Sequence, residues 1–308
     1  MKLSFVVPCY NEAENVTALQ NAIMQAFSNC GYDYEIIFVD DGSKDATLHN
    51  LKKLYHKKAC PIKVISFSRN FGKEAAIYAG LSHADGEYIT FIDADLQQSP
   101  DTVLQMVNIL DNEPQYDSVA AYQDRRKESK ILRFFKKMFY RLINRLSDID
   151  LKADASDFRT IRRTVADSIL SLGEYHRFSK GIFAWVGYNT CYIPYTVCKR
   201  LSGKSKWNFY SLLNYAVEGI IGYSTMPLRI ATFCGGITAV MAMIYLIIVV
   251  LEKLIAGIDI PGYATIIVLI LLLGGIQLFC IGIIGEYVGK IFEQSKDRPI
   301  YIAKEILK

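Results

Sequence analysis

Two aspartates directly follow an apolar run in residues 88–97, YITFIDADLQ. The β-branched and aromatic run 89–92 predicts a buried strand that ends at Asp93 and Asp95. Because side chains alternate along a strand, both carboxylates face the same side where it ends. Adjacent carboxylates repel unless a cation lies between them, and Mg²⁺ or Mn²⁺ prefers such oxygen ligands. The pair therefore indicates a metal site, and an acidic turn capping the helix near Ser99 is the alternative.

The elements around this pair alternate between strands and helices. Apolar runs predict further strands at 3–8, 34–39, 62–67 and 119–122. Helices are expected to about residue 30, to about 58, over 74–83 and to about 110. This alternation predicts an α/β domain with a mainly parallel, doubly wound sheet. Ligands bind beyond the carboxyl ends of such strands. Four polar segments fall there: 8–12, 40–43, 68–73 and 93–97.

The apolar residues concentrate near the C-terminus. The chain has 308 residues, of which 51% are hydrophobic. Segments of about 230–251 and 263–285 contain no charged side chain, and each is long enough to cross a hydrocarbon core of about 30 Å. Two buried helices of a soluble core are the alternative. Lysines and arginines flank the pair on its outer sides, so both termini are expected in the cytoplasm.

The remaining composition narrows the function classes. The seven cysteines form no CxxC pair and the four histidines are scattered, so a zinc site is not predicted. The net charge is only +4, but basic residues gather in 127–146, KESKILRFFKKMFYRLINRL. Near 128–146 they form a basic amphipathic helix suited to a membrane surface, and aromatic residues at 207–223 suggest a second interfacial helix. Packing of the basic helix on the sheet is the alternative. Nucleic-acid binding would not explain the two apolar segments and is not predicted.

Five motifs occur in order along the chain: VVPCYNE, VDDGSKD, SRNFGKEAA, FIDADLQ and RLSGKSKW. They resemble the motifs of family 2 glycosyltransferases, which have a GT-A fold. They are most similar to the polyprenyl-phosphate glycosyltransferases, namely dolichol-phosphate mannose synthases and bacterial undecaprenyl-phosphate (bactoprenol) glucosyltransferases. The resemblance implies a cytoplasmic catalytic domain over 1–225, two transmembrane helices within 226–288 and a cytoplasmic tail over 289–308.

The resemblance also implies a UDP-sugar donor, with glucose expected first and N-acetylglucosamine or another sugar as the alternative. Asp41, beside Asp40, would meet the uracil N–H, and helix capping by either residue is the alternative. Asp95 would be the principal ligand of Mg²⁺ or Mn²⁺, with Asp93 and Gln97. The implied nucleotide-sugar contacts are Pro8, Tyr10, Glu12, Asp40, Asp41, Arg69, Lys73 and Asp93.

The implied acceptor is undecaprenyl or another polyprenyl phosphate. A phosphate monoester with a second pKa of about 6 is largely ionised at neutral pH, so it needs cations more than a general base. Asp157 matches a position proposed as the base in the family, and positioning an arginine or the acceptor is the alternative. The candidates for binding the lipid phosphate are Arg125, Arg126, Arg159, Arg200, Ser205 and Lys206.

The resemblance therefore implies an inverting displacement at the membrane, with Asp93, Asp95 and Asp157 as the catalytic candidates. It further implies a homo-oligomer, specifically a tetramer, and a flippase as a possible partner. A processive polysaccharide synthase is an alternative, although such enzymes carry a QxxRW-type motif and more spans. A non-catalytic membrane adaptor is another, although it would not need an intact aspartate pair.

Overall fold

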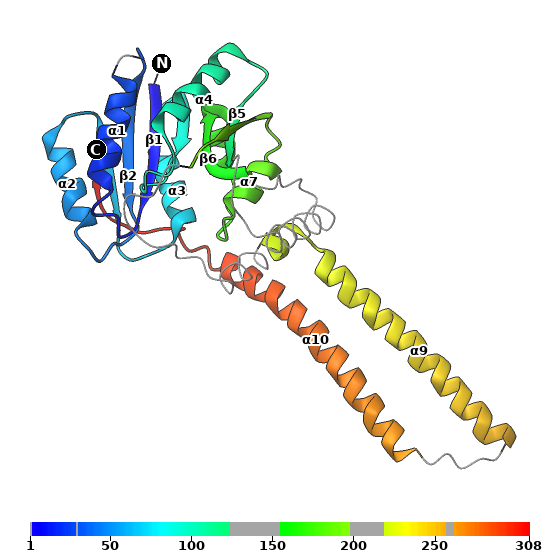
Figure 1. The fold of residues 1–308 in the computed structure, drawn as a ribbon. Coiled ribbons are helices and arrows are strands. Elements are labelled where there is room, and N and C mark those ends of the chain that lie inside the picture. The colour runs from blue at the N-terminus through cyan, green and yellow to red at the C-terminus, as the bar shows by residue number, and fades with distance from the viewer. Residues whose placement is uncertain (1, 29, 124–154, 198–218, 257–261) are drawn as a thin grey trace. The chain divides into compact units, whose positions relative to one another are not determined.

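A computed structural model describes residues 2–28, 30–123, 155–197, 219–256 and 262–308 (Figure 1). The chain divides into two compact units, and the first comprises Met1–Asn144, Ile149–Leu212 and Arg298–Lys308. The basic helix expected near 128–146 and most of the 207–223 segment lie outside the described residues.

The first unit is built on an eight-stranded sheet in the order β7-β5-β6-β4-β1-β2-β3-β8. Its strands are β1 (Lys2–Cys9), β2 (Asp33–Asp40), β3 (Ile62–Phe67), β4 (Tyr88–Phe91), β5 (Ser118–Gln123), β6 (Ala155–Arg162), β7 (Thr190–Tyr195) and β8 (Ala303–Leu307). β6 lies antiparallel to β4 and β5, and β8 lies antiparallel to β3, whereas the other neighbouring pairs are parallel. The predicted mainly parallel α/β fold is confirmed.

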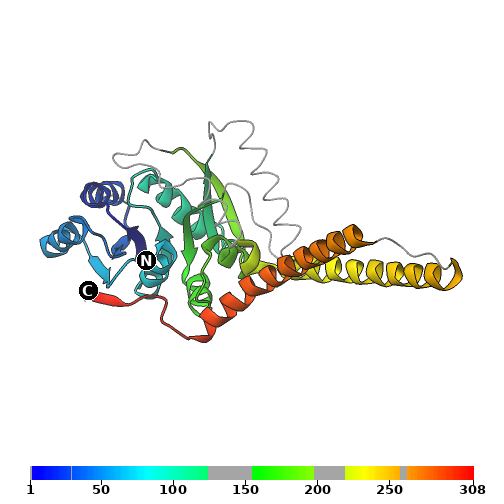
Figure 2. The same ribbon diagram turned by 90° about the horizontal axis from the view of Figure 1, so that it is seen from below.

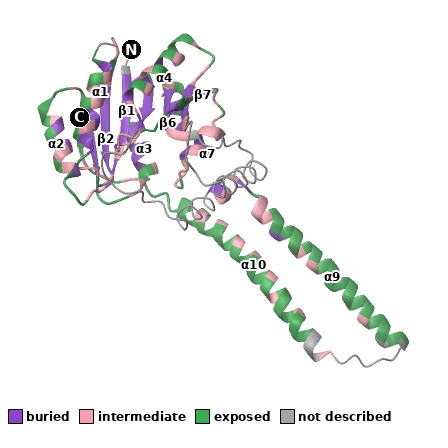
Figure 3. Cartoon of the chain, viewed as in Figure 1, coloured by how far each residue is buried: buried purple, intermediate pink, exposed green. Residues whose placement is uncertain are grey.

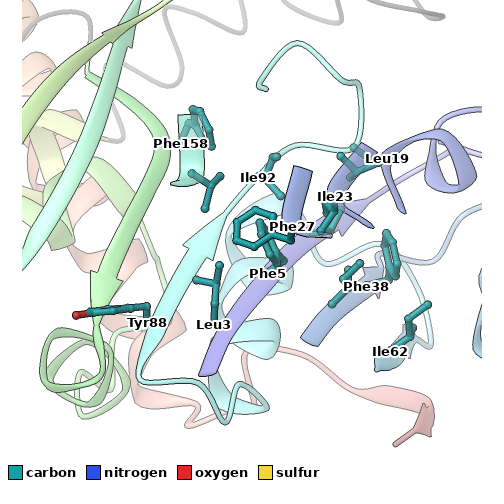
Figure 4. Close-up of a cluster of buried hydrophobic side chains, with 14 of the residues drawn as sticks. Leu3, Phe5, Leu19, Ile23, Phe27, Phe38, Ile62, Tyr88, Ile92 and Phe158 are labelled. Atoms are coloured by element: carbon teal, nitrogen blue, oxygen red, sulfur yellow. The ribbon is translucent and has the colours of Figure 1, made fainter. Parts of the chain in front are cut away.

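Helices cover both faces of this sheet. They are α1 (Val16–Phe27), α2 (Thr47–Lys57), α3 (Lys73–Ser82), α4 (Pro100–Asn112), α6 (Arg163–Leu170) and α7 (Ser179–Trp185). On one face, Phe5 packs edge-on against Phe27 at 5.2 Å between ring centroids, within the main hydrophobic core (Figure 4). Burying one such ring stabilises the fold by about 1.5–3 kcal/mol.

The other face requires a small residue in α3. A Cβ at Gly80 would lie 2.3 Å from Cγ1 of Val6 in β1, so α3 can approach the sheet only because position 80 has no side chain. Lys73 is the first residue of α3. The close packing of α3 on β1 therefore helps to determine the position of Lys73.

The second unit contains two long helices, α9 (Met226–Ala256) and α10 (Tyr263–Ser295). Their stretches 226–252 and 266–295 are long and apolar enough to cross a membrane. In the most apolar 18 residues of each stretch, 0% of the residues are buried (Figure 3). The Tyr287 hydroxyl donates to the Ser224 carbonyl at 2.6 Å, joining the residues just before α9 to α10. These apolar helices indicate that the chain associates with a membrane.

The C-terminal segment differs from the expected tail over 289–308. α10 continues to Ser295, because charged residues that end the apolar pattern are still compatible with a helix. Ala303–Leu307 then form β8 on the edge of the sheet beside β3 (Figure 2). The last residues therefore belong to the first unit.

Candidate functional site

The loops after β1 and β2 are hydrogen-bonded to each other. The amide of Asn11 donates to Ser43 Oγ at 3.0 Å, and the amide of Lys44 donates to Asn11 Oδ1 at 2.9 Å. The amide of Glu12 donates to Thr47 Oγ1 at 2.8 Å. These hydrogen bonds hold the loop that carries Tyr10 and Glu12 beside the loop after β2. The two loops are neighbours because β1 and β2 are parallel and end at the same edge of the sheet.

Asp40 and Asp41 differ in their surroundings. Asp40 is 1% exposed, and its two carboxylate oxygens accept from the Ser43 amide and the Ser66 hydroxyl. This arrangement favours a structural role for Asp40 rather than the implied contact with a nucleotide.

Asp41 joins the β2 loop to the loop 68–72 between β3 and α3. Its carboxylate accepts from the amide of Phe71 at 2.6 Å and from the amide of Gly72 at 3.0 Å. Burial outweighs these hydrogen bonds and raises the pKa of Asp41 above its usual value. Asp41 thus satisfies the two backbone amides directly before the first residue of α3, a role close to the alternative of helix capping.

The same two loops approach each other closely at Gly42. A Cβ there would lie 2.5 Å from the carbonyl carbon of Arg69, and Gly42 has a φ of +65°. Only glycine fits both conditions without strain. The Arg69 guanidinium lies 4.1 Å above the Phe71 ring, on the exposed side of this loop.

Lys73 joins the aspartate pair to β6. Its Nζ lies 2.7 Å from Asp93 Oδ1 and 3.6 Å from Asp157 Oδ2. Burial lowers the pKa of Lys73, but the two carboxylates outweigh burial and raise it. Burial likewise raises the pKa of Asp157, but Lys73, Lys180 and Arg159 outweigh burial and lower it. Both groups are therefore charged at neutral pH.

The aspartate pair lies in an ordered turn. The amide of Asp93 donates to Gln98 Oε1 at 2.9 Å, and Gln98 Nε2 donates back to Asp93 Oδ2 at 3.3 Å. Asp95 Oδ1 accepts from the amide of Gln97 at 3.2 Å. Ser99, not the aspartate pair, caps α4 by accepting from the Asp101 amide. The alternative explanation of the pair as a helix cap is therefore wrong.

The turn supplies only part of a metal coordination shell. Among the described residues, no group of three or more His, Cys, Asp and Glu side chains is arranged to hold a metal ion. Asp93 and Asp95 still provide hard oxygens at one strand end, which fits Mg²⁺ or Mn²⁺ completed by water and substrate phosphates.

Arg159 is a buried cation next to Asp157. It is 5% exposed, its guanidinium lies 3.7 Å above the Phe183 ring, and Nη2 donates to the Ser156 carbonyl at 3.2 Å. Burial lowers its pKa to about 10. Its Nε is inaccessible to solvent and has no partner within the described parts of the chain. An incoming anion would relieve this unsatisfied donor.

Glu74 is a site residue that the sequence interpretation missed. Its carboxylate accepts from the amide of Ser179 at 3.1 Å and from the Ser179 hydroxyl. Burial, followed by the nearby Asp157 charge, raises the pKa of Glu74 to about 7. Its position as an acidic residue in a helix rich in small and apolar residues, KEAAIYAGLS, was the available signal.

The structure brings together four of the predicted site residues: Lys73, Asp93, Asp157 and Arg159. Pro8, Tyr10, Glu12, Asp41 and Arg69 lie in or beside the neighbouring strand-end loops. Five lipid-phosphate candidates lie outside the described residues, namely Arg125, Arg126, Arg200, Ser205 and Lys206.

This mainly parallel α/β sheet with helices on both faces is a GT-A-like fold. Residues 4–170 match the family model Glycosyl transferase family 2, and residues 226–291 match the GtrB C-terminal hairpin. The chain therefore belongs to glycosyl transferase family 2 and is a glycosyltransferase.

Full-length relatives agree with this assignment. The chain is 42% identical to the putative glycosyltransferase CsbB of Bacillus subtilis, covering 98% of this chain and 91% of the relative. It is 38% identical to the prophage bactoprenol glucosyl transferase homolog of Escherichia coli, covering 100% of both chains. It is also 38% identical to the bactoprenol glucosyl transferase of Shigella phage SfV, covering 99% of this chain and 98% of the relative.

A solved structure supports the fold. Glucosyl-3-phosphoglycerate synthase from Mycobacterium tuberculosis, in complex with Mn²⁺, UDP and phosphoglyceric acid, gives a TM-score of 0.51 at 18% identity. The match covers 71% of this chain and 76% of that chain, and at this identity it concerns the fold alone.

Proposed function

We propose that this enzyme transfers a sugar, with glucose expected first, from a UDP-sugar to undecaprenyl or another polyprenyl phosphate. The observation that carries the proposal is the full-length similarity, through both the catalytic domain and the hairpin, to proteins named bactoprenol glucosyl transferase. The product is a polyprenyl-phosphate-linked monosaccharide for modification of cell-envelope glycans.

The donor would bind along the strand-end loops. Pro8, Tyr10 and Glu12 would frame the nucleoside, and Asp41 would contribute from the β2 loop. Arg69 and Lys73 would meet the base or the pyrophosphate. The Lys73 ammonium is already held between two carboxylates, so it has a defined place from which to meet phosphate.

Asp95 and Asp93, with Gln97, would hold Mg²⁺ or Mn²⁺, which when bound neutralises charge on the departing diphosphate. The Mn²⁺ and UDP in the mycobacterial neighbour support a divalent cation in this fold class. Lys73 forms an ion pair with the same Asp93 carboxylate. Its ammonium therefore adds a second positive charge beside the proposed metal site, and this charge does not depend on metal binding.

The acceptor phosphate would meet Arg159, together with Arg125, Arg126, Arg200, Ser205 and Lys206. Arg159 favours this role because its guanidinium is positioned by Phe183 and retains an unsatisfied donor. Planar guanidinium groups match phosphate oxygens in pairs, which suits a doubly charged head group.

The reaction would be a single in-line displacement. An ionised phosphate oxygen attacks the anomeric carbon, a new carbon–oxygen bond forms, and UDP leaves from the opposite side with the bonding electrons, which inverts the configuration. No proton needs to be removed from the attacking oxygen. The lowered pKa of Asp157 makes it a weak base at neutral pH, so we assign it the positioning of Lys73 and Arg159.

The enzyme would lie at the cytoplasmic face of the membrane, with both termini in the cytoplasm and α9 and α10 as its spans. The expected tetramer and flippase partner are further parts of the proposal and follow from the resemblance alone.

The test is transfer from radiolabelled UDP- and GDP-sugars to undecaprenyl phosphate, with Mn²⁺ or with a chelator. Label in a lipid product from one UDP-sugar, lost in the chelator, is expected, and the Asp95→Asn variant serves as the inactive control. Binding of a nucleotide-sugar without any lipid product would contradict the proposed acceptor and point to a different one.

A further inference from the structure

Besides the pairing of β8 with β3, the C-terminal segment makes further contacts within the first unit. β8 pairs with β3 from Leu307 opposite Val64 to Ala303 opposite Phe67. Before this ladder begins, the carbonyl of Ile302 accepts from the amide of Ser68 at 3.0 Å. Ser68 is the first residue of loop 68–72, so the returning segment supports the loop where it leaves the sheet.

Tyr301 contacts both elements that flank this loop. Its ring stacks on Phe67 at the end of β3, with 4.9 Å between centroids and 23° between planes. It also meets the Tyr78 ring of α3 at 6.4 Å, and its hydroxyl lies 3.4 Å from Ser82 Oγ. One side chain from the C-terminus therefore links the strand before the loop to the helix after it.

The contacts continue into the loop. The Phe67 ring meets Phe71 edge-on at 5.7 Å, and the Arg69 guanidinium lies 4.1 Å from the Phe71 ring centroid. On the other side, Asp41 accepts from the Phe71 amide. The loop is therefore held between Asp41 and a row of aromatic rings that ends at Tyr301.

We propose that the C-terminal segment positions the donor-binding loop, with Tyr301 acting through Phe67 and Phe71 on Arg69 and Lys73. Pairing with residues 303–307 already covers the exposed edge of β3. Covering this edge therefore does not require the contacts of Tyr301 or of the Ile302 carbonyl. The inference rests on the proposed function in one respect, because it takes loop 68–72 as part of the donor site.

The test compares two substitutions in the full-length chain. Tyr301→Ala removes the ring beside the loop, whereas Leu307→Ala weakens β8 at its opposite end, against Val64. Tyr301→Ala should raise the Kd for UDP and the KM for the donor about 5- to 10-fold, with an unchanged acceptor KM. Tyr301→Phe should restore both values, and Leu307→Ala should change neither.

Hydrogen exchange separates this inference from the proposed function. Amides of loop 68–72 should exchange faster in Tyr301→Ala than in Leu307→Ala when each variant is measured equally far below its own melting temperature. Equal exchange in the two variants, or equal Kd values for UDP, would overturn the positioning role. Should the unmodified protein bind no UDP, the donor assignment fails, and the exchange comparison alone decides whether Tyr301 orders the loop.

Discussion

Lys73 and Asp93 form an ion pair with 2.7 Å between Nζ and Oδ1, which joins the first residue of α3 to the turn after β4. The same ammonium lies 3.6 Å from Asp157 of β6. Three elements distant in sequence therefore meet at one cation. A charge held in this way would need little rearrangement to meet the proposed diphosphate, which is the condition for effective electrostatic catalysis.

Lys73→Met removes this cation while keeping a side chain of similar length. We expect kcat/KM for sugar transfer to fall about 100-fold, because the repulsion between Asp93, Asp157 and the diphosphate is no longer offset. Lipid product formation measures the effect. Lys53→Met, on the exposed surface of α2, is the control and should retain activity. A rate for Lys73→Met close to that of the control would contradict the assignment.

Asp95→Asn should abolish metal-dependent turnover while the protein remains folded and membrane-bound. The amide keeps the size of the side chain but removes the charge that a divalent cation requires. Turnover is measured across a Mn²⁺ titration, with a melting curve to establish folding. Asp33→Asn, exposed at the opposite end of the parallel strands, is the matched control. Normal activity in Asp95→Asn would refute the metal site.

Arg159→Lys should raise the acceptor KM about 10-fold and leave the Kd for UDP unchanged. Lysine keeps the charge but loses the planar group stacked on Phe183. Steady-state kinetics with varied polyprenyl phosphate measure the change. Arg162→Lys, which loses bonds to the Tyr116 and Leu110 carbonyls, should lower the melting temperature without changing the acceptor KM. Equal acceptor KM values for Arg159→Lys and the unmodified enzyme would exclude the phosphate role.

Glu74 should make the stability of the first unit depend on pH. Its folded pKa of about 7 lies above the ordinary value of 4.5. The stabilising contribution of the protonated form is complete below pH 4.5 and is lost as the pH rises through 7. The melting temperature should therefore fall between pH 5 and pH 8 more in the unmodified protein than in Glu74→Gln. Identical pH dependence in both would show that Glu74 does not titrate in this range.

Local patterns in the sequence were enough to predict much of the architecture and some of the residues that the structure brings together at the candidate site. The apolar run 89–92 predicted the strand that precedes Asp93 and Asp95, and uncharged segments predicted α9 and α10. No sequence pattern predicted β6, β7 or β8, because none of these strands contains a long apolar run. It also left Glu74 without a role.

Only the tertiary structure decided which distant residues meet. Glu74 and Ser179 are 105 positions apart, and no periodicity links them. The antiparallel pairing of β6 with β4 determines that Asp157 lies beside Lys73, and the pairing of β8 with β3 brings Tyr301 beside Phe67, where loop 68–72 begins. The sequence by itself determined the alternating strands and helices of the N-terminal half and the two apolar helices, because side-chain periodicity and residue type are local properties. Partners across the sheet depend on long-range packing, which no local pattern contains.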